Sequence, residues 1–241
     1  LTYTPTAGYV GNDALIVTAI EADTPAGETP LSSKIQINIS VRDVAQPQPP
    51  VLQTSGVNRD FTEMGPSVPV DDKITLIDAD STQMASASVT ISSGFSPDDS
   101  LSCSAQGSIS CAFNSNNGQL LLTGSASVDA YQTALQSVTF KSTSKNPTMN
   151  TTTRTLTWSA SDGLNSSSPV TSIVNVIALN DAPTLTAGDV VSYTENGSPI
   201  AVGTKIRITD PDSANLTRAV VSIDAGFTAG DKLSFTPDAT G

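Results

Sequence analysis

Hydrophobic and polar side chains alternate along short stretches of the chain. Ala87, Val89 and Ile91 alternate with serine and threonine, and residues 155–160 show the same pattern around a tryptophan. Successive side chains of a β-strand point to opposite faces, so a period of two predicts strands with one buried face. Clusters of Gly, Asn and Pro separate these stretches and are typical of turns. The pattern predicts an all-β protein built from antiparallel β-sandwiches.

One stretch departs from this period. Val128, Tyr131, Leu135 and Val138 are spaced by three, four and three residues, which is one face of a helix. Ser127 stands where an N-cap is expected, since its hydroxyl can accept a hydrogen bond from the first turn. We therefore expect one short helix that packs against the sandwich of the middle domain.

The chain contains an internal repeat. Residues 61–103 match residues 193–235 without gaps at an offset of 132, with 17 identities in 43 positions. This period is too long for a solenoid unit, so each repeat is predicted to be a domain. The predicted parts are residues 1–46, the C-terminal part of one domain; residues 47–180, a complete domain; and residues 181–241, the N-terminal part of a third. The chain begins and stops inside strand-like runs, from which we expect it to be a piece of something longer.

The composition excludes several classes of function. The formal net charge is −12 and the sequence pI is about 4.1, so nucleic acids and anionic membranes are poor partners, whereas dications are suitable ones. The chain has no histidine, which excludes Ser-His-Asp and Cys-His catalysis and the usual zinc sites. No hydrophobic run approaches the ~20 residues of a membrane-spanning helix, so we expect no insertion of this segment into a membrane.

Two short acidic motifs recur at the repeat offset. "IDADS" contains Asp78 and Asp80, and "TDPDS" contains Asp210 and Asp212. Residues two apart in an extended chain point to the same side, so each pair can present two carboxylates to one cation. The alternative is that each pair only forms a solvated turn, because aspartate is common in turns.

Cys103 and Cys111 are the only cysteines. With a turn at residues 106–108 they would lie opposite each other on a hairpin, which suits a disulfide. The alternatives are a pair of buried thiols or a metal site, but the latter lacks histidine or further cysteine ligands. Phe235 occupies the counterpart of Cys103 in the next repeat, so the bond would belong to one domain only.

Four segments together resemble a known family. They are "TPTAGYVGNDALIVTA" (4–19), "LTGSASVDAYQTALQSVTF" (122–140), "WSASDG" (158–163) and "ALNDAPTL" (178–185). They resemble the cadherin-like repeats of large bacterial surface adhesins, and the middle domain also resembles chondroitin-sulfate-proteoglycan-type repeats. The resemblance implies tandem immunoglobulin- or cadherin-like antiparallel β-sandwiches with calcium between consecutive domains.

The resemblance also implies the calcium ligands. Those of the second junction would be Glu63, Asp162, Asn180, Asp181, Asp210 and Asp212. Those of the first junction would be Asp43, Asp78 and Asp80. The first linker, residues 42–50, is rich in proline and lacks the Asn-Asp-Ala-Pro of the second. We therefore expect fewer or weaker ions there, with stiffness supplied by the prolines.

The function expected from these features is mechanical. The chain would be part of an extracellular, cell-surface adhesin that supports cell adhesion and biofilms, in which calcium locks neighbouring repeats of the same chain into a rod. Alternatives are a subunit that joins other copies in a filament or surface layer, and a carbohydrate- or protein-binding module. An enzyme is not expected, because the acidic pair recurs in both repeats and only 5% of residues are aromatic.

Overall fold

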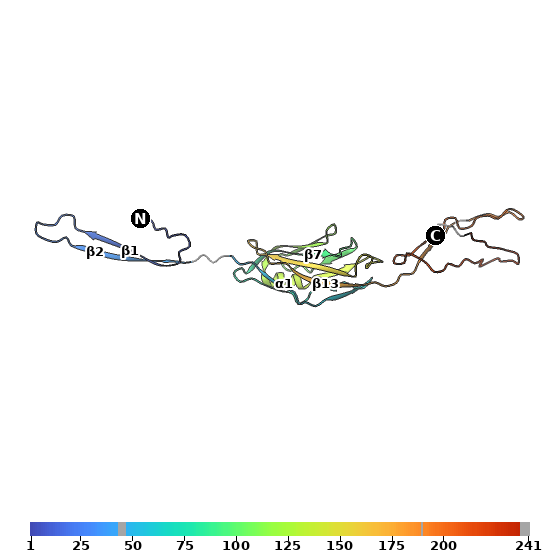
Figure 1. The fold of residues 1–241 in the computed structure, drawn as a ribbon, viewed down its shortest axis with the longest axis horizontal. Coiled ribbons are helices and arrows are strands. Elements are labelled where there is room, and N and C mark those ends of the chain that lie inside the picture. Colours follow the sequence, from blue (N-terminus) through green and yellow to red (C-terminus); the bar gives the residue numbers. More distant parts are fainter. Residues whose placement is uncertain (43–46, 189, 237–241) are drawn as a thin grey trace. The chain divides into compact units, whose positions relative to one another are not determined.

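The chain folds almost entirely into strands. The computed structural model describes residues 1–42, 47–188 and 190–236. These residues form two compact units, Leu1–Gln48 and Pro49–Gly241. One helix, α1, occurs among the described residues and lies within the second unit (Figure 1). The predicted all-β class with a short helix in the middle domain is confirmed.

The first unit is a long β-hairpin. Strand β1 (Gly11–Ile20) pairs antiparallel with β2 (Ser32–Val41), from Gly11 opposite Val41 to Ile20 opposite Ser32. Hydrophobic side chains such as Ile16 and Ile35 are exposed along both strands.

The second unit contains a β-sandwich of two main sheets. The larger sheet has the order β4-β13-β12-β7-β10-β9, and the smaller has the order β5-β11-β8. The larger sheet comprises β4 (Arg59–Thr62), β7 (Gln83–Ser93), β9 (Ser110–Asn114), β10 (Gln119–Ser127), β12 (Thr153–Ser161) and β13 (Val170–Ile177). The smaller comprises β5 (Val68–Pro69), β8 (Asp99–Ser102) and β11 (Thr139–Ser142), and β3 (Val51–Gln53) pairs separately with β6 (Thr75–Ile77).

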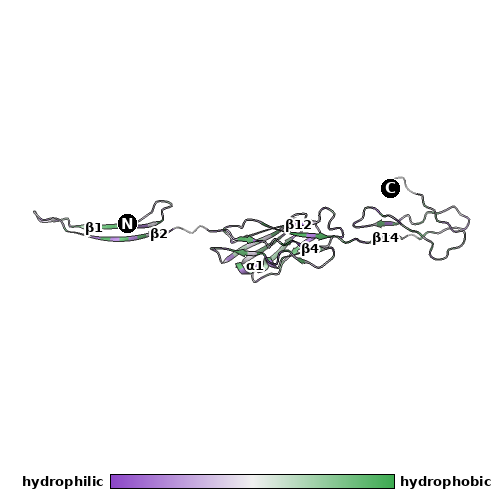
Figure 2. Ribbon diagram, turned by 60° about the horizontal axis from the view of Figure 1, so that its bottom comes forward, coloured by the Kyte–Doolittle hydropathy of each residue, from purple (hydrophilic) through white to green (hydrophobic). Residues whose placement is uncertain are grey.

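The core lies between these two sheets. The alternation predicted from the sequence is confirmed along β12 and from Ala87 to Ile91 of β7, where every second side chain, including Val89 and Trp158, is buried. Phe61 of the larger sheet meets Phe140 of the smaller edge to face, with ring centroids 5.2 Å apart. Figure 2 shows that the hydrophobic residues of the sandwich lie mainly in its strands.

Helix α1 (Val128–Gln136) begins where the sequence predicted. The Ser127 hydroxyl accepts a hydrogen bond from the Ala130 N–H, and Tyr131 and Leu135 are buried. Two glutamines on the helix form hydrogen bonds with the backbone of β6 and of the residue before it. Gln132 accepts from the Leu76 N–H at 2.9 Å, and Gln136 donates to the Ile74 carbonyl at 2.9 Å. The helix thus satisfies backbone groups that a neighbouring strand would otherwise bind.

Strand register decides which residues share an end of the sandwich. In β12 and β13, Thr153 lies opposite Asn175 and Trp158 lies opposite Val170. The two strands run in opposite directions, so the beginning of β12 and the end of β13 share one end of the sheet. Strand β4 runs parallel to β13 and ends at the same place, with Thr62 beside Ile177.

The first part of the sandwich is repeated after residue 181. Strand β14 (Thr184–Thr186) pairs with β15 (Arg207–Thr209) in the same register as β3 with β6: Thr184 faces Thr209 as Val51 faces Ile77. The left-handed backbone of Met64 (φ 56°) also recurs at Asn196 (φ 61°), at the sequence offset of the repeat. Local geometry therefore repeats together with the sequence.

Ala219, Val221 and Ile223 alternate with other residues as Ala87, Val89 and Ile91 do at the repeat offset, but they form no strand. These residues are the counterparts of β7, yet Val221 is 71% exposed. In the sandwich β7 is held by β10 and β12, whereas the counterparts of those two strands would fall beyond residue 241. The alternating pattern is present, but among the described residues it has no neighbouring strands to pair with.

Cys103 and Cys111 are joined by a disulfide, with their Cα atoms 6.2 Å apart. The predicted hairpin geometry is wrong, because β8 and β9 on either side of the bond belong to different sheets. A turn closed by the Ile109 N–H and the Gln106 carbonyl connects them. The bond therefore ties the edge of one sheet to the edge of the other.

A buried ion pair anchors the loop between β11 and β12. Arg154 is 1% exposed, and its Nε donates to Asp99 Oδ2 at 2.6 Å. Its two terminal nitrogens donate to the carbonyls of Pro147 (2.9 Å) and Thr151 (3.2 Å). One guanidinium therefore binds both a buried carboxylate and the backbone of the loop, which satisfies most of its donors.

We predict that Arg154→Met lowers the free energy of unfolding by about 3–5 kcal/mol, because it leaves the Asp99 charge buried without its cationic partner. Urea unfolding followed by the fluorescence of the single tryptophan, Trp158, measures this. An added Asp99→Asn substitution should recover part of the loss. Arg59→Met, which breaks the more exposed pair with Asp72, is the control and should change stability by no more than about 1 kcal/mol. A loss below about 1 kcal/mol for Arg154→Met would contradict the anchoring role.

We also predict that replacing both cysteines with serine lowers the free energy of unfolding by about 2.5 kcal/mol, because the bond closes a short loop in the unfolded chain. The same urea titration measures it. Reduction of the unaltered protein should give a matching shift, and retained stability in both experiments would show that the bond does not stabilise the sandwich.

Candidate metal centre

A buried glutamate marks the end of the sandwich from which the chain leaves. Glu63 follows β4 and is 3% exposed. Its Oε2 accepts from the Leu179 N–H at 2.8 Å, and its own N–H donates to the Ile177 carbonyl at 2.9 Å. The parallel pairing of β4 with β13 thus brings this carboxylate beside the start of the linker.

The linker then contacts the second acidic motif. The Asp181 N–H donates to Asp212 Oδ2 at 3.0 Å. The Asn180 side-chain amide donates to the Asp181 carbonyl at 3.0 Å, which leaves its Oδ1 oxygen as a further acceptor. Three of the predicted ligands, Asn180, Asp181 and Asp212, are therefore close in space although 31 residues separate the two aspartates.

Each Asp-x-Asp motif forms a turn. Asp210 Oδ1 accepts from the N–H groups of Asp212 (3.2 Å) and Ser213 (2.9 Å). Asp78 Oδ1 accepts from Asp80 and Ser81 in the same way, at 3.1 and 2.8 Å. The turn anticipated as an alternative is present, but it uses only one oxygen of the first aspartate, so the turn and a cation site are compatible.

The Asp210 and Asp212 carboxyl groups interact with each other. A hydrogen bond from the Asp212 carboxyl lowers the pKa of Asp210, and the N–H groups of Ser213 and Asp212 lower it further, against an opposing effect of desolvation. The lowered pKa favours the ionised form of Asp210, which is the form that binds a dication.

Two carboxylate oxygens at this linker are buried without any hydrogen-bond partner. They are Asp181 Oδ2 and Asp212 Oδ1, and Asp78 Oδ2 shares this property in the first motif. An unpaired buried carboxylate oxygen is costly, so such atoms call for a ligand. Carboxylate and amide oxygens without nitrogen or sulfur donors are the set that calcium prefers. The residues present therefore fit calcium.

The described residues do not form a finished cage. No group of three or more His, Cys, Asp or Glu side chains among them is arranged to hold a metal. Calcium takes about 6–8 oxygens, including backbone carbonyls and water, so the acidic side chains need not supply the whole set. The chain brings together the linker and the Asp210–Asp212 turn. These side chains supply only part of the ligand set of a calcium ion.

Asp162 is not part of this cluster, and its predicted role at the second junction is wrong. It follows β12, whose last residues lie at the opposite end of the sheet from Ile177. Its Oδ1 accepts from the N–H groups of Leu164 (2.7 Å) and Asn165 (2.6 Å), which lower the pKa of Asp162. This carboxylate closes a local turn at the end of the sandwich where β7 begins, since Ser161 pairs with Ser86.

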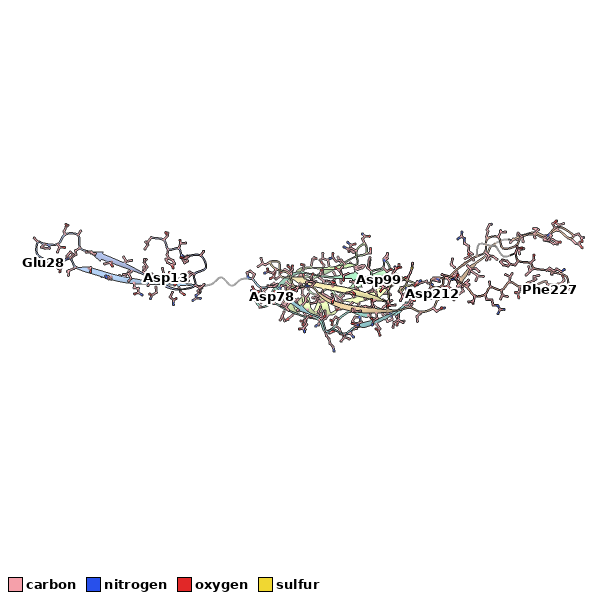
Figure 3. All side chains as sticks on the ribbon, in the orientation of Figure 1. Asp13, Glu28, Asp78, Asp99, Asp212 and Phe227 are labelled. Carbon is pink, nitrogen blue, oxygen red and sulfur yellow. A yellow bond between two sulfur atoms is a disulfide. The ribbon has the colours of Figure 1, made fainter. Side chains whose placement is uncertain are left out.

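The first junction is described on one side only. Asp78 and Asp80 belong to the second unit and follow β6, whereas Asp43 lies outside the described residues. Figure 3 shows Asp78 at one end of the sandwich, while Asp99 lies at the end that faces Asp212. The two acidic motifs therefore lie near opposite ends of the same sandwich. The ligands expected at the first junction, Asp43, Asp78 and Asp80, stay a prediction.

One contact at the second junction was missed by sequence reasoning. The Asn146 side-chain amide, in the loop held by Arg154, donates to the Pro211 carbonyl at 3.1 Å. Pro211 is the middle residue of the Asp210–Asp212 turn. An asparagine in a loop rich in Ser, Thr and Asn gives no signal of a partner 65 residues away.

Comparisons with known proteins give structural neighbours only. No protein-family model matches the chain, and no curated protein matches it. Solved structures that align with 84% of the chain are protocadherin gamma B2 extracellular cadherin domains 1–5 (18% identity, TM-score 0.29), protocadherin gamma B7 extracellular cadherin domains 1–4 (18%, 0.28) and the protocadherin gamma B7 EC3–6 cis-dimer (17%, 0.25). The chain spans 32%, 41% and 44% of their respective lengths. These neighbours are tandem cadherin domains, but at such TM-scores the likeness does not determine function.

The described part of the chain contains no helix with the length and hydrophobicity to cross a membrane.

We predict that Asp212→Asn weakens calcium binding at the second junction by about tenfold or more, since a charged ligand is lost while the shape of the turn is kept. Asp162→Asn is the matched control and should leave the affinity unchanged, because Asp162 lies at the other end of the sandwich. Isothermal titration calorimetry measures both. Equal weakening of calcium binding by the two substitutions would show that Asp162 does contribute to the second junction.

Proposed function

We propose that the chain is a spacer segment of an extracellular, surface-attached repeat protein whose consecutive β-sandwich repeats are stiffened by calcium at their junctions. The observation that carries this proposal is the pair of buried, unpartnered oxygens of Asp181 and Asp212 at the linker. Glu63, Asn180, Asp181, Asp210 and Asp212 would hold the ion. When bound, calcium would supply the positive charge that offsets the repulsion of these carboxylates.

The protein's own residues set the mechanical behaviour. Glu63 accepts from the Leu179 N–H and fixes where the linker leaves the sandwich. Asp181 is joined through its N–H to Asp212 of the following repeat. Without a cation, repulsion among these carboxylates opposes close approach, and the linker bends more freely. With a cation, the same carboxylates hold the two repeats at one angle.

The surface charge and the sequence resemblance support the wider role. A net charge of −12 suits calcium and disfavours nucleic acids. A disulfide is typical of an oxidising environment, which agrees with an extracellular or cell-surface location. Together with the resemblance to bacterial adhesin repeats, these features support a stalk for cell adhesion and biofilms rather than an enzyme.

We predict a longer particle and a higher melting temperature in calcium than in chelator. Binding to the folded state alone stabilises it by about 2.7 kcal/mol at a calcium concentration 100 times the Kd. Small-angle X-ray scattering measures the maximum dimension, and calorimetry measures the melting temperature. An Asp210→Asn, Asp212→Asn double variant should behave in calcium as the unaltered chain does in chelator. Identical scattering and melting of the unaltered chain with and without calcium would refute the stiffening mechanism.

A second candidate function is a subunit of an extracellular filament or surface layer. The observation that favours it is the exposure of hydrophobic side chains, including Ile16 on β1 in the first unit and Val221 and Leu233 in the last repeat. Strands of a second copy could cover them by β-addition. Sedimentation velocity at rising concentration separates the two candidates, because a filament subunit would assemble and a spacer would stay monomeric.

A further inference from the structure

The loop of residues 143–152 connects the sandwich to the following repeat through a contact that does not involve the linker itself. Asn146 in this loop donates through Nδ2 to the Pro211 carbonyl at 3.1 Å. Since a carbonyl only accepts, the amide must present its nitrogen, so the direction of this hydrogen bond is fixed by chemistry. The contact joins two segments that are 65 residues apart.

The loop is anchored in the protein core. Arg154 binds the Pro147 carbonyl next to Asn146, and it is paired with Asp99 in the interior. The Thr143 N–H donates to the Asp98 carbonyl at 3.0 Å, and the Asn146 N–H donates to the Ser144 hydroxyl at 3.2 Å. An asparagine held in this way loses little further entropy when it docks onto a partner.

The partner of Asn146 is a backbone carbonyl between two predicted calcium ligands. The ring of Pro211 restricts the backbone of the Asp210–Asp212 turn, and the turn is closed by the Asp212 and Ser213 N–H groups. Asn146 is neutral and binds no carboxylate there, so it does not compete with a cation for the Asp210 or Asp212 side chains. A calcium ion and this hydrogen bond can therefore act at the same junction.

We propose that Asn146 is a metal-independent strut that orients the Asp210–Asp212 turn toward the sandwich before calcium binds. It is a positioning residue of the junction, and its effect on calcium rests on the proposed function, whereas its effect on the docked geometry does not. By holding the turn near the linker, it raises the fraction of chains competent to bind the ion. An apparent affinity falls in proportion to that fraction.

The test is a distance measurement with and without calcium. Spin labels at Lys141→Cys and Ser222→Cys report on the sandwich and the last repeat, with the native disulfide left in place. In chelator, the doubly labelled protein with Asn146 intact, which is the unaltered background, should give one preferred distance. Adding Asn146→Ala should broaden the distance distribution. The control Asn116→Ala, at an exposed turn between β9 and β10, should match the unaltered background. Calorimetry should show calcium affinity about 2- to 10-fold weaker for Asn146→Ala, the effect of one hydrogen bond.

The outcomes separate the strut from the calcium mechanism. Identical distributions for Asn146→Ala and the unaltered background in chelator would overturn the strut, as would the absence of any preferred distance in that background. A preferred distance that Asn146→Ala abolishes, combined with no response to calcium, would support the strut and refute the proposed calcium stiffening. Equal melting of the sandwich in all variants shows that the substitutions act at the junction and not on folding.

Discussion

The contact between the linker at Asp181 and the acidic Asp210–Asp212 turn is the constraint on which the junction depends. Like charges 4 Å apart repel by about 1 kcal/mol in water and by about 4 kcal/mol near a protein surface. Backbone N–H groups relieve part of this at Asp210 and Asp212, but Asp181 and Asp212 each keep one buried oxygen without a donor. The chain therefore leaves two buried carboxylate oxygens that a bound cation would satisfy.

The sandwich supplies the fixed frame for this arrangement. The parallel pairing of β4 with β13 sets Glu63 against the departing chain, and the Arg154–Asp99 pair holds the loop that carries Asn146. None of these contacts uses a metal. The frame is thus formed by folding alone, and under the proposed function an ion would act only on the angle between the repeats.

Local patterns were enough to predict much of the fold. The alternation in β7 and β12 and the Ser127-capped helix depend on residues close in sequence, and both are present. Features set by distant partners were not predictable in the same way. Asp162 has the expected acidic motif, but strand register carries it to the wrong end of the sheet. Residues 219–223 have the strand pattern but no neighbouring strands among the described residues, and the Asn146 contact has no local signature at all.

The direction of β4 relative to β13 has a mechanical consequence. The chain passes from the first linker through the short strand β3 to β4 and leaves β13 toward the second linker, and β4 and β13 lie side by side and parallel over four residue pairs. Tension along the chain would pull β4 back toward its beginning and β13 forward toward its end. The strands would then slide lengthwise past each other, and their hydrogen bonds would be strained together rather than opened one at a time. A domain stretched in this shearing geometry resists force at the strands through which the force enters and leaves.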